Sequence, residues 1–238
     1  MLTISIVSHG HGALLAQFLR DLGTVVRTPF QVVLTLNIPE PELAEFCVAP
    51  YPLQLIRNPQ PRGFGANHNA ALRLAGPGTF CVINPDVRLT ADPFPALLAA
   101  LADPRVAIVA PVITDAAGRM ESTARRFPTP LSILRKAVFG APAAEYEFGS
   151  APLAVDWVSG VFLVVGSQAY SQLGGFDERY FLYYEDVDLC ARARALGHEV
   201  LLVPGAQAMH AARRDSHRKL RYMRWHLASM GRFFLTRY

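Results

Sequence analysis

The sequence predicts an α/β protein with one large, mostly parallel sheet that is covered by helices on both faces. Short apolar runs alternate along the chain with amphipathic stretches, which is the order that parallel sheets require. The length of 238 residues and the hydrophobic fraction of 51% suffice for a large core. The charged fraction of only 18% is far from that of a disordered chain.

The expected elements follow one another from the N-terminus. Strands are predicted where short apolar runs are bounded by turn residues; these are 3–8, 31–36, 53–57, 79–83, 106–110, 156–165 and 199–203. Helices are predicted where apolar residues recur at spacings of three and four, or where helix boundary residues are present; these are 13–22, 67–74, 93–102 and 185–196. Residues 136–154 have no clear period and are predicted to form a long loop.

The charge of the chain is concentrated at its end. The formal net charge is +4, but residues 210–238 hold eight basic residues and one acidic residue, so this tail is +7 and residues 1–209 sum to −3. Such a tail can contact nucleic acid, an anionic membrane or a diphosphate. Nucleic acid is disfavoured because the body is acidic and the sequence has no interleaved aromatic platforms.

The tail also predicts an amphipathic helix. Its apolar residues recur at spacings of three and four; they are Leu220, Met223, Leu227, Met230 and Phe234. Arginines fall on roughly the opposite face of the helix. Two interpretations remain open: the helix lies on an anionic membrane, or its stripe packs on the body or on a second copy in a homodimer.

Cysteine content and hydropathy bear on the compartment. The three cysteines are odd in number and have no metal-binding spacing, and Cys81 lies inside a predicted strand. The N-terminus reads as a strand and lacks a basic region of the kind that begins a signal peptide. Apolar stretches such as residues 161–165 are far shorter than the roughly 20 residues of a membrane-spanning helix. We therefore expect a cytoplasmic protein, with contact of its tail to the inner face of the membrane as an open alternative.

The most informative motif is Asn84-Pro85-Asp86, which follows the apolar run 80–83. A strand that ends in this way places a carboxylate at the carboxyl edge of the sheet, where open α/β sheets bind ligands. A carboxylate suits Mg²⁺ or Mn²⁺, which in turn neutralises a diphosphate. The alternative is a plain turn, because these residue types are common in turns.

A second acidic motif, Glu185-Asp186, begins a predicted helix. A carboxylate within hydrogen-bond reach of a hydroxyl group can accept its proton. Asp188 is expected to be structural, because residues two apart on a helix do not share a face. The alternative is that these acidic residues only favour the helix start through its dipole.

Further motifs accompany these two along nearly the whole chain. In order, the set is Ile4-Ser5-Ile6-Val7-Ser8, Arg57-Asn58-Pro59, Gly63-Phe64-Gly65-Ala66-Asn67-His68-Asn69, Asn84-Pro85-Asp86, Ala124-Arg125-Arg126-Phe127-Pro128, Asp156-Trp157-Val158-Ser159-Gly160, Gly174-Gly175-Phe176-Asp177-Glu178, the run 181–190 and His210. Each motif is weak alone, but their order resembles that of the family 2 glycosyltransferases, which are inverting enzymes of the GT-A fold. Within that family the chain is most similar to bacterial rhamnosyltransferases.

The resemblance implies a division of labour along the chain. Residues 1–115 would bind the nucleotide sugar, residues 116–209 would form the acceptor-binding and catalytic half of the same domain, and residues 210–238 would be a basic helical tail. Asp86 resembles the last aspartate of the family's DXD motif, with Asn84 in place of the first. His210 would approach the metal or the diphosphate, although a lone histidine is more often structural. Asp186, paired with Glu185, would be the catalytic base.

The resemblance also implies substrate contacts. The donor-binding residues would be Ser8, His9, Asn37, Gly65, Asn69, Asn84 and Asp86. The acceptor-binding residues would be Trp157, Gly160 and Tyr184. The expected function is metal-dependent, inverting transfer of a sugar from a nucleoside-diphosphate donor, with dTDP-rhamnose as the expected donor, to a surface-glycan or lipid-linked glycan acceptor. The alternative function is a catalytically silent domain that binds a nucleotide sugar or glycan as an assembly or regulatory module.

One departure from the family pattern concerns the nucleotide base. Relatives end the second strand with an aspartate-asparagine pair, whereas this chain has Leu36-Asn37 followed by residues 39–42, Pro-Glu-Pro-Glu. A leucine cannot accept a hydrogen bond from a pyrimidine NH group. Either Asn37 or a backbone carbonyl accepts this bond, or base recognition is loose.

Overall fold

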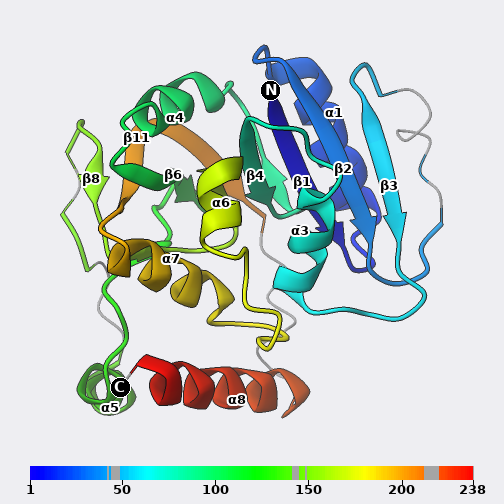
Figure 1. Cartoon of the computed structure of the whole chain (residues 1–238). Coiled ribbons are helices and arrows are strands. Elements are labelled where there is room, and N and C mark those ends of the chain that lie inside the picture. Colours follow the sequence, from blue (N-terminus) through cyan, green and yellow to red (C-terminus); the bar gives the residue numbers. More distant parts are fainter. Residues whose placement is uncertain (42, 44–48, 141–144, 148, 212–219, 238) are drawn as a thin grey trace.

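A nine-stranded sheet forms the centre of the molecule, and helices lie on both sides of it (Figure 1). The computed structural model describes residues 1–41, 43, 49–140, 145–147, 149–211 and 220–237. In sheet order the strands are β3 (Leu53–Arg57), β2 (Phe30–Leu36), β1 (Leu2–Ser8), β4 (Thr79–Ile83), β10 (Phe162–Gly166), β6 (Val106–Thr114), β11 (Glu199–His210) and β5 (Val87–Arg88). The short strand β8 (Leu153–Ala154) pairs with β11 outside this order.

Most strands run in one direction. β1 is parallel to β2 and β4, β2 is parallel to β3, and β6 is parallel to β11. β10 lies antiparallel between β4 and β6, so these two strands are themselves parallel. The mostly parallel sheet is therefore confirmed. Because β10 comes from the second predicted half and inserts between two strands of the first half, both halves share one sheet.

Different helices cover the two faces. α1 (Ala13–Val25) and α4 (Phe94–Leu101) pack on one face; α3 (Phe64–Leu72), α6 (Ser167–Gln172) and α7 (Glu185–Ala195) pack on the other. Successive side chains of a strand point to opposite faces. In β10, Phe162 therefore packs with α1 and α4, and Leu163 packs with the second set of helices. Cys81 is fully buried, as expected.

Several predicted boundaries change. β6 and β11 continue beyond the predicted ends at residues 110 and 203, through Pro111 and Pro204. In β11 the register shifts between Val203 and Gln207, and this bulge accommodates the proline. α3 begins at Phe64 rather than at residue 67, so Gly65 lies inside its first turn.

The single strand predicted at 156–165 is wrong. It is divided into β9 (Trp157–Val158), which pairs with β7 (Ala124–Arg125) in a separate two-stranded sheet, and β10. The chain leaves the strand conformation around Gly160, whose backbone N–H donates to Asp186 rather than to a neighbouring strand. The break therefore has a polar cause that an apolar run does not reveal.

The long loop predicted at 136–154 is also wrong at its beginning and near its end. Residues 136–139 belong to helix α5 (Pro130–Phe139), and β8 lies near the other end. α5 begins with a capping box in which Thr129 and Ser132 bond to each other's backbone N–H groups. These signals lie before residue 136, outside the stretch expected to be irregular. Residues 141–144 and 148 of the predicted loop lie outside the described residues.

The predicted C-terminal helix is present as α8 (Leu220–Arg237), which lies beyond α7 on the outside of the molecule (Figure 1). It packs through Trp225, Ser229 and Phe233: Trp225 stacks on Phe181 with ring centroids 4.6 Å apart, and Ser229 Oγ donates to the carbonyl of Leu182. The predicted stripe does not make this contact, since Leu220, Met223 and Leu227 are exposed. For these three residues, packing on the body is therefore wrong. Among the described residues, no helix is both long enough and apolar enough to span a bilayer.

Gly65 has a packing role that predicts a stability change. A Cβ atom at this position would lie 2.5 Å from Cβ of Phe176, well inside normal carbon contact. We expect Gly65→Ala to lower the free energy of unfolding by about 1–3 kcal/mol, because the neighbouring core must be displaced. Chemical denaturation measures this change. Gly231→Ala in α8, where nothing lies within 4 Å, is the matched control and should be neutral or stabilising; equal effects of the two changes would contradict the packing role.

Candidate active site

Asp86 and His210 meet where β5 pairs with β11. Asp86 comes directly before β5, and the register pairs Val87 with His210. The carbonyl of Asp86 also accepts from Ala211 N at 2.8 Å. The result is that His210 Nε2 lies 3.4 Å from Asp86 Oδ2, although the residues are far apart in the sequence.

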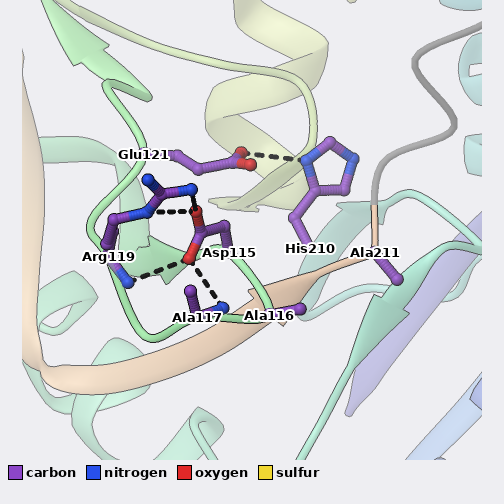
Figure 2. A pocket seen from close by; sticks show the side chains of 7 residues that line it. All are labelled: Asp115, Ala116, Ala117, Arg119, Glu121, His210 and Ala211. Atoms are coloured by element: carbon purple, nitrogen blue, oxygen red, sulfur yellow. Dashed lines mark hydrogen bonds and ion pairs between the residues drawn. The ribbon is translucent and has the colours of Figure 1, made fainter.

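Glu121 holds the other side of the His210 ring (Figure 2). His210 Nδ1 lies 2.9 Å from Glu121 Oε2, and Glu121 N donates to the carbonyl of Ile113. Burial alone would lower the pKa of His210, but the carboxylates of Asp86 and Glu121 together raise it. Burial would raise the pKa of Asp86, but its hydrogen bond with His210 and the nearby positive charge lower it. The three side chains therefore form a carboxylate–imidazole–carboxylate chain.

A pocket of about 250 Å³ opens beside His210. Figure 2 shows the residues that line it; they are Asp115, Ala116, Ala117, Arg119, Glu121, His210 and Ala211. Arg119 closes one side through an ion pair with Asp115, with its guanidinium 2.7 Å from the carboxylate. A group bound in this pocket would lie next to the imidazole of His210.

Asp186 is held in one orientation at the start of α7. Its Oδ2 accepts from Gly160 N at 2.9 Å and its Oδ1 from Val187 N at 2.8 Å. Burial raises the pKa of Asp186 above the ordinary aspartate value even though both hydrogen bonds oppose the rise. As a residue, Asp186 is half-buried, whereas Glu185 beside it is buried. Asp186 therefore combines access with a raised affinity for protons.

Glu185 has a different environment. Only 5% of the residue is exposed, and its Oε2 is buried without a hydrogen-bond partner among the described residues. Burial raises its pKa well above the ordinary value, and the charge of Asp186 adds to the rise. A carboxyl group in this position favours its protonated form. Of the predicted pair, Asp186 is therefore the better placed to receive a proton from a substrate.

Two strained residues precede this pair. Tyr183 and Tyr184 have φ values of 72° and 68°, a region that non-glycine residues seldom occupy. The ring of Tyr184 packs against His226 and Phe233 of α8, with centroids 5.4 and 5.6 Å away. Such strain persists only when surrounding contacts impose it. α8 therefore helps to fix the turn from which Asp186 projects.

A short backbone segment joins the two carboxylate sites. Asn84 N donates to the carbonyl of Val161 at 2.9 Å, and the preceding residue, Gly160, donates to Asp186. A Cβ atom on Gly160 would lie only 3.1 Å from the ring of Phe64, so a side chain is poorly accommodated there. Asp86 and Asp186 therefore lie at the same edge of the sheet, on either side of residues 160–161.

The predicted base-binding region lies at the carboxyl ends of β1 and β2. Leu36 is buried in the core at 3% exposure. Asn37 Oδ1 already accepts from Asn58 Nδ2 and Arg62 N, both at 2.8 Å, and Asn37 Nδ2 lies 3.4 Å from His9 Nδ1. Asn37 thus organises the surrounding loops and brings His9 close.

Glu40 places a carboxylate in this region. Its Oε2 accepts from Ser8 Oγ at 2.8 Å and its Oε1 accepts from Gly10 N at 2.9 Å. Ser8 is the last residue of β1 and stands in register with Leu36. Glu40 therefore places its carboxylate at the end of β1. This point lies next to the end of β2, where Leu36 stands in place of the family's aspartate.

The remaining predicted residues are those expected to bind the donor, Asn69 and Gly65, and those expected to bind the acceptor, Trp157 and Tyr184. Asn69 holds the turn before Asp177, because its Oδ1 accepts from Tyr170 Oη and Phe176 N and its Nδ2 donates to the carbonyl of Phe176. Donor binding by Asn69 and Gly65 stays a prediction. Trp157 and Tyr184 belong to one small cluster under α7, and Trp157 Nε1 donates to the carbonyl of Arg126.

Sequence reasoning did not select Glu121 or Glu40. No local motif marks Glu121, since its partner His210 is 89 residues away. Glu40 does have a signal: it lies just after the strand end that departs from the family pattern. His11, which contributes positive charge near Asp86, also went unselected.

The fold is that of the GT-A class of proteins. Solved structures share this fold: GalNAc-T7 with UDP, GalNAc and Mn²⁺ matches with a TM-score of 0.71 at 15% identity over 90% of this chain and 44% of that chain. The mannosyltransferase PcManGT from Pyrobaculum calidifontis, in complex with GDP-Man and Mn²⁺, matches with a TM-score of 0.68 at 18% identity over 97% of this chain and 64% of that chain. These likenesses show the fold.

The family follows from the sequence comparisons. Residues 2–227 match the family model for glycosyltransferase like family 2, and the chain belongs to this family. It is 30% identical over 232 residues to an N-acetylglucosaminyl-diphospho-decaprenol L-rhamnosyltransferase of Mycobacterium tuberculosis, covering 88% of this chain and 76% of the relative. It is 27% identical over 245 residues to the rhamnosyltransferase WbbL of Escherichia coli K12, covering 98% and 92%. The chain is thus a rhamnosyltransferase-like glycosyltransferase, which argues against a catalytically silent module.

Proposed function

We propose that this glycosyltransferase transfers rhamnose from a nucleoside diphosphate, with inversion, to a hydroxyl group of a lipid-linked glycan. The observation that carries the proposal is the placement of Asp86 and Asp186 on either side of residues 160–161 at one edge of the sheet. The names of two relatives support rhamnose as the sugar, and the name of the mycobacterial relative supports a lipid diphosphate acceptor.

Asp86 and His210 suit a divalent cation. Asp86 Oδ1 is buried and has no hydrogen-bond partner among the described residues, and His210 Nε2 points toward the same carboxylate. No group of three or more His, Cys, Asp and Glu side chains in the described part of the chain is arranged to hold a metal alone. This fits Mg²⁺ or Mn²⁺, which commonly take one or two protein ligands and complete their shell with phosphate and water. When bound, the ion would neutralise the charge of the departing diphosphate.

Glu121 would act through His210. With the ion bound, Glu121 would accept the Nδ1 proton, and the ion would take the place of the proton that Nε2 otherwise shares with Asp86. This tautomer is inferred from the hydrogen-bond network. Glu121 is therefore a positioning residue for the proposed metal ligand.

Asp186 would accept the proton of the attacking hydroxyl group. The hydrogen bonds from Gly160 and Val187 fix its carboxylate, and the residue is less buried than Glu185. Its raised pKa strengthens it as a base relative to an ordinary aspartate. Attack from this side, opposite a diphosphate held at Asp86, gives inversion at the anomeric carbon.

Replacing Asp186 tests the base. We expect Asp186→Asn to lower kcat by about 10²–10⁴, the usual contribution of general base catalysis, and to leave donor affinity unchanged. In the native enzyme, kcat/KM should fall as the pH falls through the pKa of Asp186, because the protonated carboxyl cannot accept a proton. Burial raises that pKa, so the fall should lie above the value of about 3.9 typical of aspartate. Initial rates of diphosphate release across pH measure both; normal turnover by Asp186→Asn, with the loss appearing in Glu185→Gln, would assign the base to Glu185.

Replacing Asp86 tests the metal site. Asp86→Ala should remove the Mn²⁺-dependent part of donor-diphosphate affinity, because the ion loses its carboxylate ligand. Titration calorimetry of the nucleoside diphosphate with and without Mn²⁺ measures this difference. Glu121→Gln should weaken Mn²⁺-dependent binding about 10-fold or more, the usual effect of removing the partner of a metal-bound histidine. Asp103→Asn, in an exposed ion pair with Arg105, is the control and should bind as the native protein does; a native Mn²⁺ dependence in Asp86→Ala would refute the site.

Glu40 is proposed to read the nucleotide base in place of the missing aspartate. Glu40→Gln should lower the affinity for dTDP about 10-fold, because a hydrogen bond to a charged group is lost, and should change the affinity for GDP much less. The ratio of the two dissociation constants measures this preference. Asp103→Asn, in the exposed ion pair with Arg105, again serves as the control. An unchanged ratio in Glu40→Gln would assign base recognition to other groups.

A further inference from the structure

Helices α5 and α8 together expose an apolar surface. Its members are Leu131, Leu134 and Val138 of α5 and Met223, Leu227 and Leu235 of α8, each between 53% and 88% exposed. In α5 the three residues follow one another at spacings of three and four, and in α8 Met223 and Leu227 are four residues apart. These spacings place the residues of each helix in a stripe along it. We call these six residues the apolar surface.

The two helices lie close together. Phe127, just before α5, packs in the same cluster as Phe233 and Phe234 of α8. Figure 1 likewise shows α5 beside the C-terminal end of α8, on the side of the molecule away from the sheet. The six residues of the apolar surface therefore lie on two neighbouring helices.

The body of the protein leaves this surface uncovered. α8 packs on the loop before α7 through Trp225, Ser229 and Phe233, and this uses a different side of the helix. Met223 and Leu227 point elsewhere and remain exposed. An apolar area of this kind, rimmed by polar groups, marks an interaction site.

The charge on the two helices identifies the partner. Neither α5 nor α8 contains an acidic residue, and Arg135 and Arg224, which lie next to Leu134 and Met223 in the sequence, are exposed. Apolar side chains flanked by arginines suit an anionic lipid surface, which takes up the former and attracts the latter. A two-fold dimer through this surface would place the same basic groups opposite one another, which is unfavourable.

We propose that the apolar surface docks the enzyme on an anionic membrane. The proposal rests on the proposed function in one respect: docking would bring a lipid-linked acceptor to Asp186. α8 supplies the connection, because Ser229 Oγ bonds to the carbonyl of Leu182, three residues before Glu185. A membrane at α8 is thus separated from the proposed base by a single helix and the turn that it supports.

Vesicle flotation tests the docking. The full chain should float with vesicles of phosphatidylglycerol and phosphatidylcholine and remain unbound with phosphatidylcholine alone, and high salt should weaken flotation. Leu134→Glu and Leu227→Glu should each reduce the bound fraction about 10-fold, because each places a charge where an apolar side chain would enter the membrane. Leu196→Glu is the matched control: Leu196 is 62% exposed at the end of α7, outside the apolar surface, and this variant should float like the native protein.

Melting temperatures show whether the variants remain folded, and light scattering gives the oligomeric state. If either variant unfolds, Arg224→Gln, which leaves the apolar residues intact, should still lower binding to anionic vesicles. Absence of flotation by the native chain overturns the proposal, and so does an equal loss in Leu196→Glu. A native dimer that Leu227→Glu dissociates, without vesicle binding, would assign the surface to a second copy instead.

Activity measurements separate this proposal from the proposed function. The docking variants should lose turnover on an acceptor carried in anionic vesicles and keep turnover on a short, water-soluble acceptor. Asp186→Asn should lose turnover on both and still float. Flotation without turnover in the native protein would therefore contradict the proposed function alone, whereas turnover without flotation would contradict the docking alone.

Discussion

The hydrogen bond from Gly160 N to Asp186 is the interaction on which the site depends. It ends the strand conformation between β9 and β10, and it sets the carboxylate of Asp186 beside the backbone that also accepts from Asn84. One peptide segment is thereby shared by the proposed base and the proposed metal motif. Since β10 is fully inserted between β4 and β6, this segment cannot move without disturbing the centre of the sheet.

The helix at the C-terminus provides a second constraint. Two consecutive tyrosines with positive φ store backbone strain directly before α7, and their stability requires contacts from outside the turn. His226 and Phe233 of α8 provide ring contacts, and Arg237 reaches Asp188 in the first turn of α7 at 3.0 Å. α8 is therefore part of the structure that orients Asp186. A contact made on the outer side of α8 lies close to the proposed catalytic base.

Much of the fold could be predicted from local sequence patterns. Strands such as β1 and β4 are apolar runs with clear ends, and the helix that begins at Glu185 has both an acidic start and a glycine stop at Gly197. Asp86 and Asp186 could be singled out because each follows or begins such an element. What could not be predicted has long-range causes. The strand predicted at 156–165 is interrupted at Gly160, which bonds to a side chain 26 residues away. The side of α8 that packs on the body could not be chosen from the apolar stripe, because Trp225 and Phe233 make that contact instead.

The hydrogen-bond partners of the site residues could not be predicted either, because they too lie far away in the sequence or in loops. His210 could be named from its position at the end of a strand, yet its orientation depends on Glu121, which the end of β6 brings within 2.9 Å. Leu36 could be recognised as a departure, yet only the folded loop shows that Glu40 returns a carboxylate to Ser8 and Gly10. A carboxylate that is absent from a strand end can thus be supplied by the loop that follows the strand. The chemistry at a sheet edge depends on where a group lies in space and not on its position in the sequence.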